Sequence, residues 1–249
     1  MILELDCGNT RIKWRVREGA EIHEKNSCLT LEGLESIAIA EALQKKIERV
    51  WVSSVLDDEY SKKIVAWSLS YLGLNPEFAV SELSGNGVSN GYQQPEKLGV
   101  DRWLGILAAR ARSTEAFVVI DCGSAITVDV VTSQGEHLGG YIAPGLKLMR
   151  EALNTKTNAI NLGRIGYPEN PFPGRNTVLA IKAAELIMIS GLVIHAKNIL
   201  QHYEMNEPSL WITGGDGEWL SSVIEKSVFI EDLVLDGLEI ALDAEGGQR

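Results

Sequence analysis

The stretch Asp6-Cys7-Gly8-Asn9-Thr10 sets the pattern on which this chain of 249 residues is built. It follows a short apolar run, residues 2–5, and leads directly into a β-rich segment, residues 11–16. A similar stretch, Asp121-Cys122-Gly123-Ser124-Ala125, stands between two β-rich apolar runs in the second half of the chain. Each copy predicts a strand, an acidic glycine turn and a second strand. This order differs from the strand, glycine loop and helix of a P-loop or a dinucleotide-binding fingerprint.

The residue types in these turns suit a polyphosphate and its metal ion. An Asp at the end of a strand can hold Mg²⁺, which prefers oxygen ligands and phosphates. Gly8 and Gly123 let the backbone turn tightly and let a ligand approach it. Thr10 and Ser124 add hydroxyl groups, and the N–H groups of a turn can bind anions. One Asp-x-Gly turn alone would indicate an ordinary hairpin, but two copies in the same strand context favour nucleotide binding.

Composition limits the classes of protein to which the chain can belong. Hydrophobic residues make up 45% and charged residues 23% of the sequence, which is typical of a globular protein with a packed core. The net charge of −11 and the pI near 4.9 argue against a general affinity for nucleic acid or for anionic membranes. Cys7, Cys28 and Cys122 form no Cys-x-x-Cys pair, which favours a reducing compartment. We interpret Cys7 and Cys122 as small apolar fillers; a redox pair is the alternative.

The sequence also predicts a cytoplasmic protein. No apolar run is expected to approach the roughly 20 residues that a membrane helix needs. Glu4 and Asp6 stand where a signal peptide would have a basic start and an apolar run.

Periodicity predicts an α/β protein with two lobes, residues 1–115 and residues 116–249. Strands are expected at residues 2–6, 11–17, 21–25, 50–55, 78–80, 117–121, 126–132, 137–142, 210–213 and 228–230. Helices are expected at residues 31–47, from the capping pair Asp57-Asp58 to residue 71, at 98–112, 146–153, 176–203 with a bend near Gly191, a short one after 217, and 233–244. Residues 81–99 and 155–175 read as long polar loops, which are usually functional or disordered, and residues 245–249 as a frayed tail.

Five stretches, taken together and in order, resemble motifs of the type III pantothenate kinases, relatives of acetate and sugar kinases, Hsp70-type chaperones and actin. They are the first phosphate motif Asp6–Lys13, the Gly-x-Asp-Arg signature Gly99–Arg102, the second phosphate motif Asp121–Thr127, the stretch Gly139–Gly145, and the adenosine-side motif Thr213–Gly215. Each motif alone is weak, whereas five in order at suitable spacings are specific. Ser124 stands where the family usually has Thr, and the hydroxyl group is kept.

The resemblance implies two ribonuclease-H-like lobes of mixed β-sheet with flanking helices and a nucleotide in the cleft between them. It implies the ATP-dependent phosphorylation of the primary hydroxyl of pantothenate to 4′-phosphopantothenate, the first step of coenzyme A biosynthesis. It also implies a requirement for Mg²⁺ and for a monovalent cation, K⁺ or NH₄⁺. The expected assembly is a homodimer with the substrate pocket near the subunit interface.

The resemblance assigns roles to residues of the substrate site. Asp101 is expected to be the catalytic base that accepts the hydroxyl proton, although an Asp in this place could simply cap the helix. Arg102 is expected to pair with the carboxylate of pantothenate, the alternative being a surface ion pair. The remaining expected substrate contacts are Tyr92, Gly99, Val100 and Thr177.

The resemblance likewise assigns residues to ATP and to the cations. The expected ATP and phosphate contacts are Asp6, Gly8, Asn9, Thr10, Lys13, Gly123, Ser124, Gly214 and Gly215. Asp6 is expected to hold Mg²⁺ and Asp121 to lie near the monovalent cation. For Asp129 a structural and a cation-linked role stay open. The four histidines show no metal-ligand spacing and are interpreted as surface or satisfied core residues.

Two other functions stay open at this point. One is a kinase of another small alcohol, because a fold alone does not determine the substrate; the Gly99–Arg102 signature favours pantothenate. The other is a nucleotide-binding regulatory protein without catalysis. The acidic charge argues against direct DNA contact, and an intact Asp101 argues against a dead active site.

Overall fold

The structure is a computed structural model that describes residues 1–156, 162, 165–203 and 205–243. Its contacts divide the chain into two compact units. Unit 1 comprises residues 1–87 and 92–111 together with the segment that begins at Asp232, and unit 2 comprises residues 88–91 and 112–231.

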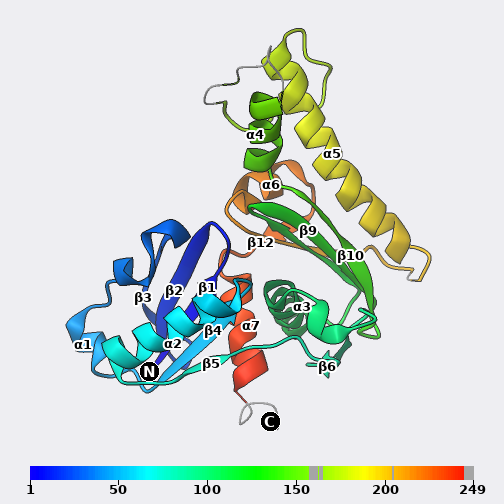
Figure 1. Ribbon diagram of the computed structural model, residues 1–249. Helices are drawn as coiled ribbons and strands as arrows, with labels where there is room; N and C mark the ends of the chain where they lie inside the picture. Colours follow the sequence, from blue (N-terminus) through cyan, green and yellow to red (C-terminus); the bar gives the residue numbers. More distant parts are fainter. Residues whose placement is uncertain (157–161, 163–164, 204, 244–249) are drawn as a thin grey trace. The chain divides into compact units, whose positions relative to one another are not determined.

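Each unit is built on a five-stranded mixed sheet, and the two sheets share one strand order (Figure 1). The order in unit 1 is β3 (Glu21–Leu29), β2 (Arg11–Glu18), β1 (Ile2–Cys7), β4 (Arg49–Ser54) and β5 (Pro76–Phe78). The order in unit 2 is β10 (His137–Pro144), β9 (Ala125–Val131), β8 (Phe117–Cys122), β11 (Ser209–Thr213) and β12 (Ser227–Phe229). In both sheets the first three strands are antiparallel and the last two join them in parallel. The repeat expected from the two acidic glycine turns is therefore confirmed.

The sheet of unit 1 is covered on both faces. Leu3 and Val52 belong to one core cluster with residues of α2 (Asp58–Leu72), whereas Trp51 belongs to another with α3 (Val100–Arg112) and α7 (Leu233–Leu242). Successive residues of a strand point to opposite faces, which explains this division. Helix α2 begins where predicted, because the Asp57 side chain accepts a hydrogen bond from the Tyr60 N–H at 2.8 Å.

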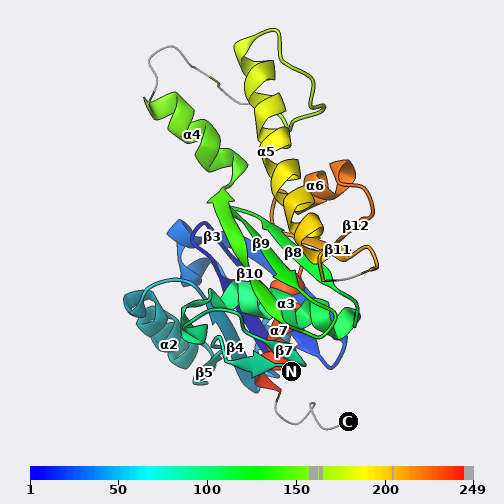
Figure 2. The same ribbon diagram turned by 90° about the vertical axis from the view of Figure 1, so that its right-hand side faces the viewer.

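Helices also cover the sheet of unit 2. Figure 2 shows α5 (Thr177–Leu200) running along this sheet, where Ile189 and Val193 pack against Val128 and other residues of β8 and β9. Leu146 of α4 (Leu146–Lys156) and Leu220 of α6 (Gly217–Val223) complete the same core cluster. Helix α5 runs through Gly191 without a break.

Three shorter elements lie in the stretch 81–99, which was expected to be a loop. They are β6 (Ser84–Gly85), β7 (Val88–Ser89) and the 3₁₀ turn η3 (Pro95–Lys97). The expected tail at residues 245–249 and part of the expected loop at 155–175 lie outside the described residues.

The helix expected at residues 31–47 is wrong. In its place stand the 3₁₀ turns η1 (Thr30–Glu32) and η2 (Leu34–Ser36) and the four-residue helix α1 (Glu41–Gln44). Gly33, between the two turns, has a φ of 79°, which a right-handed helix does not allow. The apolar residues of this segment point into the core although its backbone is irregular. Their spacing along the sequence therefore resembled that of a helix.

The apolar length of α5 also corrects an expectation. The helix has 24 residues and a mean hydropathy of 2.0, so by length and composition it could cross a membrane. Only 28% of its most apolar window is buried. A single helix of this kind is weak support for a membrane span, since a helix of a globular core passes the same test, and α5 packs on the sheet of unit 2.

The two units differ from the expected lobes, residues 1–115 and 116–249, in the segment that begins at Asp232. Helix α7 was expected in the second lobe, but it belongs to unit 1. Val234, Leu235 and Leu238 of α7 pack against Trp51 and Leu104, residues from early in the chain. Such long-range packing leaves no signal in local periodicity.

Candidate functional site

In unit 1 the first acidic glycine turn brings together the residues expected to bind phosphate. The Gly8 N–H donates to the Arg11 carbonyl at 3.0 Å and closes the turn, whose tip at residues 9–10 is exposed. The register of β1 and β2 places Asp6 directly opposite Lys13. Cross-strand partners present their side chains on the same face of a sheet. A carboxylate and an ammonium group therefore flank a turn of backbone N–H groups.

Asp101 lies in the first turn of α3, where the Trp103 N–H donates to the Gly99 carbonyl at 3.0 Å. The carboxylate Oδ1 of Asp101 accepts a hydrogen bond from the Arg102 N–H at 2.8 Å, and the helix dipole favours a negative charge there. A Cβ on Gly99 would lie 2.7 Å from this oxygen. Glycine thus leaves the space that the half-buried Asp101 carboxylate occupies. The contact satisfies one of the unpaired N–H groups in the first turn of the helix.

Arg102 and Tyr92 lie in contact within unit 1. The Arg102 side chain is buried, and its guanidinium donates to the Tyr92 hydroxyl at 2.6 Å. The guanidinium carbon lies 5.4 Å from the centroid of the Tyr92 ring, within the range of a cation–π interaction. The structure therefore orients the guanidinium and brings a residue of the 81–99 stretch to the start of α3. Trp103, the next residue, is part of the core.

In unit 2 two glycine turns meet at one edge of the sheet. Thr213 at the end of β11 pairs with Asp121 at the end of the parallel strand β8, and ligands bind outside the carboxyl ends of such strands. Gly214 has a φ of 94°, and a Cβ there would lie 2.3 Å from Asp121 Oδ1. The Asp216 N–H donates to the Cys122 carbonyl at 2.8 Å. The second phosphate motif and the adenosine-side motif therefore form one surface.

The stretch Gly139–Gly145 also reaches this turn. The Gly145 N–H donates to the Ser124 carbonyl at 3.0 Å, and a Cβ at residue 145 would lie 2.1 Å from the Gly123 carbonyl oxygen. The carboxylate of Asp121 and backbone carbonyls are hard oxygen donors, which suit Mg²⁺ or K⁺. The described residues hold no group of three or more His, Cys, Asp or Glu side chains that could form a metal cage. The donors present fit a cation shared with a phosphate ligand.

The cysteines of the two turns are buried fillers, as expected. Cys7 and Cys122 are buried free thiols. Burial first, and then the nearby Asp6, raises the pKa of Cys7 far above its ordinary value; burial and then Asp216 do the same for Cys122. A thiol held protonated is a poor nucleophile and metal ligand.

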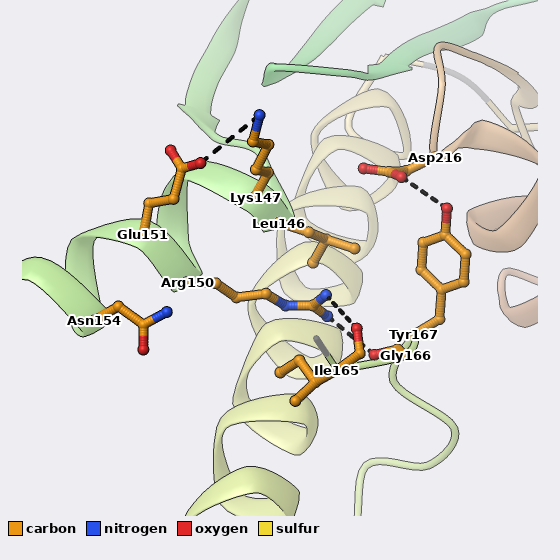
Figure 3. Close-up of a pocket in the computed structure, with 9 residues that line it drawn as sticks. All are labelled: Leu146, Lys147, Arg150, Glu151, Asn154, Ile165, Gly166, Tyr167 and Asp216. Atoms are coloured by element: carbon orange, nitrogen blue, oxygen red, sulfur yellow. Dashed lines mark hydrogen bonds and ion pairs between the residues drawn. The ribbon is translucent and has the colours of Figure 1, made fainter. Parts of the chain in front are cut away.

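A cavity of about 600 Å³ lies beside Asp216 in unit 2 (Figure 3). The Tyr167 hydroxyl donates to Asp216 Oδ1 at 2.9 Å, and this bond, with burial, raises the pKa of Tyr167 above its ordinary value. The Tyr167 ring stacks on Trp219, with centroids 5.2 Å apart and planes inclined by 5°. The lining residues are Leu146, Lys147, Arg150, Glu151, Asn154, Ile165, Gly166, Tyr167 and Asp216.

A buried ion pair fixes the wall of this cavity. Glu185, on α5, is 3% exposed and accepts two hydrogen bonds of 2.7 Å from the Arg150 guanidinium on α4. Arg150 also donates to the carbonyls of Ile165 and Gly166 at 3.1 and 3.3 Å (Figure 3). Sequence reasoning missed this group. The one signal was a glutamate in the apolar middle of a helix, where a buried charge must be paired.

Two other expected residues have defined places in unit 2. Asp129 is buried and its Oδ1 lies 2.9 Å from Nε2 of the equally buried His137. The interpretation of His137 as a satisfied core residue is confirmed. Thr177 is exposed at the first position of α5, directly after Asn176, whose side chain caps that helix.

Comparison with known proteins identifies the family. The family model for type III pantothenate kinase matches residues 2–198. The chain belongs to the type III pantothenate kinase family. Proteins named type III pantothenate kinase are 37% identical in Cellvibrio japonicus, over 100% of both chains, and 35% identical in Pseudomonas fluorescens, over 97% of this chain and 98% of that protein. One from Pseudomonas aeruginosa is 34% identical over 98% of this chain and 100% of its own.

Two solved structures resemble this fold along nearly the whole chain. A Baf-family protein from Campylobacter jejuni has a TM-score of 0.65 at 19% identity, covering 98% of this chain and 99% of its own. MreB5 of Spiroplasma citri bound to ADP has a TM-score of 0.51 at 10% identity, covering 98% and 96%. At these identities the likeness concerns the fold alone. It agrees with the mixed α/β fold of two five-stranded sheets described above.

Proposed function

We propose that the protein transfers a phosphoryl group from ATP to the primary hydroxyl of pantothenate, giving 4′-phosphopantothenate, the first step of coenzyme A biosynthesis. The observation that carries this proposal is membership of the type III pantothenate kinase family along the whole chain. Phosphoryl transfer requires mainly that a protein position its substrates and stabilise charge. We assign these two functions to the groups described above.

We assign the base to Asp101. A base that takes the proton of the attacking hydroxyl typically accelerates the reaction by about 10²–10⁴-fold. The Asp101 carboxylate stands at a helix start with one oxygen held by the Arg102 N–H. This bond orients the carboxylate, to which we assign the proton of the pantothenate hydroxyl.

Arg102 is proposed to bind the carboxylate of pantothenate. Its contact with Tyr92 orients the guanidinium before substrate binds, and a planar guanidinium suits a planar carboxylate. Gly99 and Val100, at the start of α3, are proposed as backbone neighbours of the substrate, and Thr177 as a contact from α5.

The phosphate groups of ATP are proposed to bind to the two acidic glycine turns and the Gly214–Gly215 turn. The Lys13 ammonium would balance phosphate charge, and the turn N–H groups would donate to phosphate oxygens. Asp6 is proposed to hold Mg²⁺ and Asp121 a monovalent cation, K⁺ or NH₄⁺. These cations, when bound, neutralise charge on the phosphates.

We propose that the protein acts as a cytoplasmic homodimer. Helix α5 leaves Ile187, Met188 and Ile194 more than half exposed, and exposed apolar patches of this kind mark interaction sites. A second copy of the chain, whose α5 carries the same patch, would cover these residues in a symmetric contact.

The experiment that tests the function measures ADP release from the purified protein with ATP, Mg²⁺ and K⁺, with and without pantothenate. We expect turnover that depends on pantothenate, and Asp101→Asn should lower kcat by about 10²–10⁴-fold. Asp58→Asn is the matched control, because Asp58 also lies in the first turn of a helix but is exposed on α2. It should stay within about twofold of wild type.

The other outcomes are equally informative. Absence of pantothenate-dependent turnover in the wild type would refute the proposed reaction. Equal turnover in wild type and Asp101→Asn would keep the kinase and remove Asp101 as its base.

A further inference from the structure

The segment Val88–Gly91 belongs to unit 2, although the chain on both sides of it belongs to unit 1. Within unit 2 the Ser89 N–H donates to the Gly135 carbonyl at 2.8 Å, and Ser89 forms an isolated parallel bridge with Glu136. The segment is therefore held to the start of β10. The next residue after it is Tyr92.

Gly91 is fitted tightly against His137. A Cβ at residue 91 would lie 1.7 Å from the His137 carbonyl oxygen, a distance that no side chain can adopt. The Gly91 N–H points at Nδ1 of His137, at a donor–acceptor distance of 3.4 Å. The backbone directly before Tyr92 is thus in contact with both the main chain and the ring of one residue.

The contact with Gly91 determines which ring nitrogen of His137 carries the proton. A backbone N–H can only donate, so Nδ1 accepts and must be unprotonated. Nε2 then carries the proton, and its N–H donates a hydrogen bond to Asp129 Oδ1 at 2.9 Å. The bond to the carboxylate fixes the ring orientation in a site where both side chains are at most 2% exposed.

A bulge in β10 accounts for the place of His137. The pairing of β9 and β10 shifts between His137 and Gly139, with His137 opposite Val131 and Gly139 opposite Val130. Bulges re-aim side chains beside functional sites. Val131 and Asp129 lie on one face of β9. Because His137 pairs with Val131, Asp129 is its diagonal neighbour on that face, and the ring lies beside the carboxylate.

We propose that Asp129 and His137 are positioning residues for the substrate site: they hold Gly91, and thereby the Tyr92 side chain that orients Arg102. The chain of contacts runs from Asp129 to His137, from His137 to Gly91, and through the peptide bond to Tyr92, whose hydroxyl accepts from Arg102 at 2.6 Å. This inference rests on the proposed function, which assigns Tyr92 and Arg102 to the substrate site, whereas the hold of His137 on Gly91 can be tested without it.

His137→Gln separates positioning from stability. The Gln amide can place a donor where Nε2 lies and keep the bond to Asp129, but it has no acceptor where Nδ1 lies. We expect a melting temperature close to that of wild type and a KM for pantothenate about three- to tenfold higher, with the KM for ATP unchanged, since one hydrogen bond is lost. Gly91→Ala, which pushes the segment away from an intact Asp129–His137 pair, should give the same selective rise.

His202→Gln is the matched control. His202 is exposed on the last turn after α5, and its Nδ1 contacts the Asn198 carbonyl. Both KM values should stay at the wild-type level in this variant.

Amide hydrogen exchange of residues 88–92 is the readout that does not depend on the reaction. It should speed up about three- to tenfold in His137→Gln and Gly91→Ala and stay unchanged in His202→Gln. Unchanged exchange and an unchanged KM for pantothenate would overturn the proposal, and so would an equal rise of both KM values. If the wild type does not turn over pantothenate, the proposed function fails while the exchange experiment still decides whether His137 holds this segment.

Discussion

At the scale of single residues, the candidate site depends on glycines that stand where no side chain fits. Gly214 is the clearest case. Its φ is 94°, and a Cβ added to it would lie 2.3 Å from Asp121 Oδ1. An alanine there would be strained in its backbone and would collide with the carboxylate proposed to lie near the monovalent cation.

The first prediction concerns Gly214→Ala. We expect the KM for ATP to rise at least about tenfold, because the added methyl group displaces the Asp121 carboxylate or the turn beside it. Gly73→Ala is the control: Gly73 ends α2 with a φ of 71° and has no atom within 4 Å of the added Cβ. Steady-state kinetics should show an unchanged KM for ATP in this control, with both variants losing on the order of 1–3 kcal/mol of stability to backbone strain. Equal KM values in the two glycine variants would contradict the role of this turn.

At the scale of elements, a buried charge network joins α7 to the sheet of unit 1. Glu4 on β1 is completely buried and accepts hydrogen bonds from the side chains of Arg15 and Arg17 on β2, the latter at 2.6 Å. Arg15 also donates to Asp236 of α7 at 2.7 Å. Without the Glu4 charge, the two buried guanidinium groups keep Asp236 and Glu239 as anionic partners, and both of these are more exposed than Glu4.

The second prediction follows from this network. Glu4→Gln should lower the free energy of unfolding by about 3–5 kcal/mol, as expected when a buried ion pair loses one partner. Glu41→Gln is the control, since it breaks an exposed pair with Lys45 whose side chains are 78% and 72% exposed. Such a pair contributes at most about 1 kcal/mol. Urea unfolding measures both, and a similar small loss in the two variants would show that Glu4 does not anchor the helix.

The elements that sequence patterns predicted are those determined by local chemistry. The strands around the two turns follow from runs of apolar and β-branched residues, and α2 follows from the cap at Asp57. The segment 31–47 failed because Gly33 breaks a helical spacing that burial alone had produced. The order of the motifs predicted the residues of each turn. The cavity beside Asp216 could not be predicted, because its walls come from α4, residues 165–167 and the turn after β11.

At the scale of the whole molecule, α5 exposes an apolar face that includes Ile187, Met188 and Ile194. A charged, acidic chain that leaves such a face in water should be prone to association. A second copy of the chain and a membrane surface are the two candidates for what covers it, and we favour the second copy.

The third prediction tests this assembly. Sedimentation velocity should show a dimer for the wild type and a monomer for the double variant Ile187→Lys, Ile194→Lys. Leu31→Lys is the control, because Leu31 is 99% exposed on a different unit; it should leave the dimer intact. A monomeric wild type, or flotation of the wild type with lipid vesicles, would contradict the proposal.

The attachment of α7 to unit 1 also has a consequence for how the chain folds during its synthesis on the ribosome. Gly237 of α7 lies so close to Leu104 that an added Cβ would be 2.3 Å from the Leu104 carbonyl oxygen. The face of the sheet that carries Trp51 is therefore covered only after residues 232–242 have left the ribosome. Unit 2 is complete at residue 231. Nascent chains usually fold from their first domain onward, but here unit 2 can complete its fold while unit 1 still lacks α7.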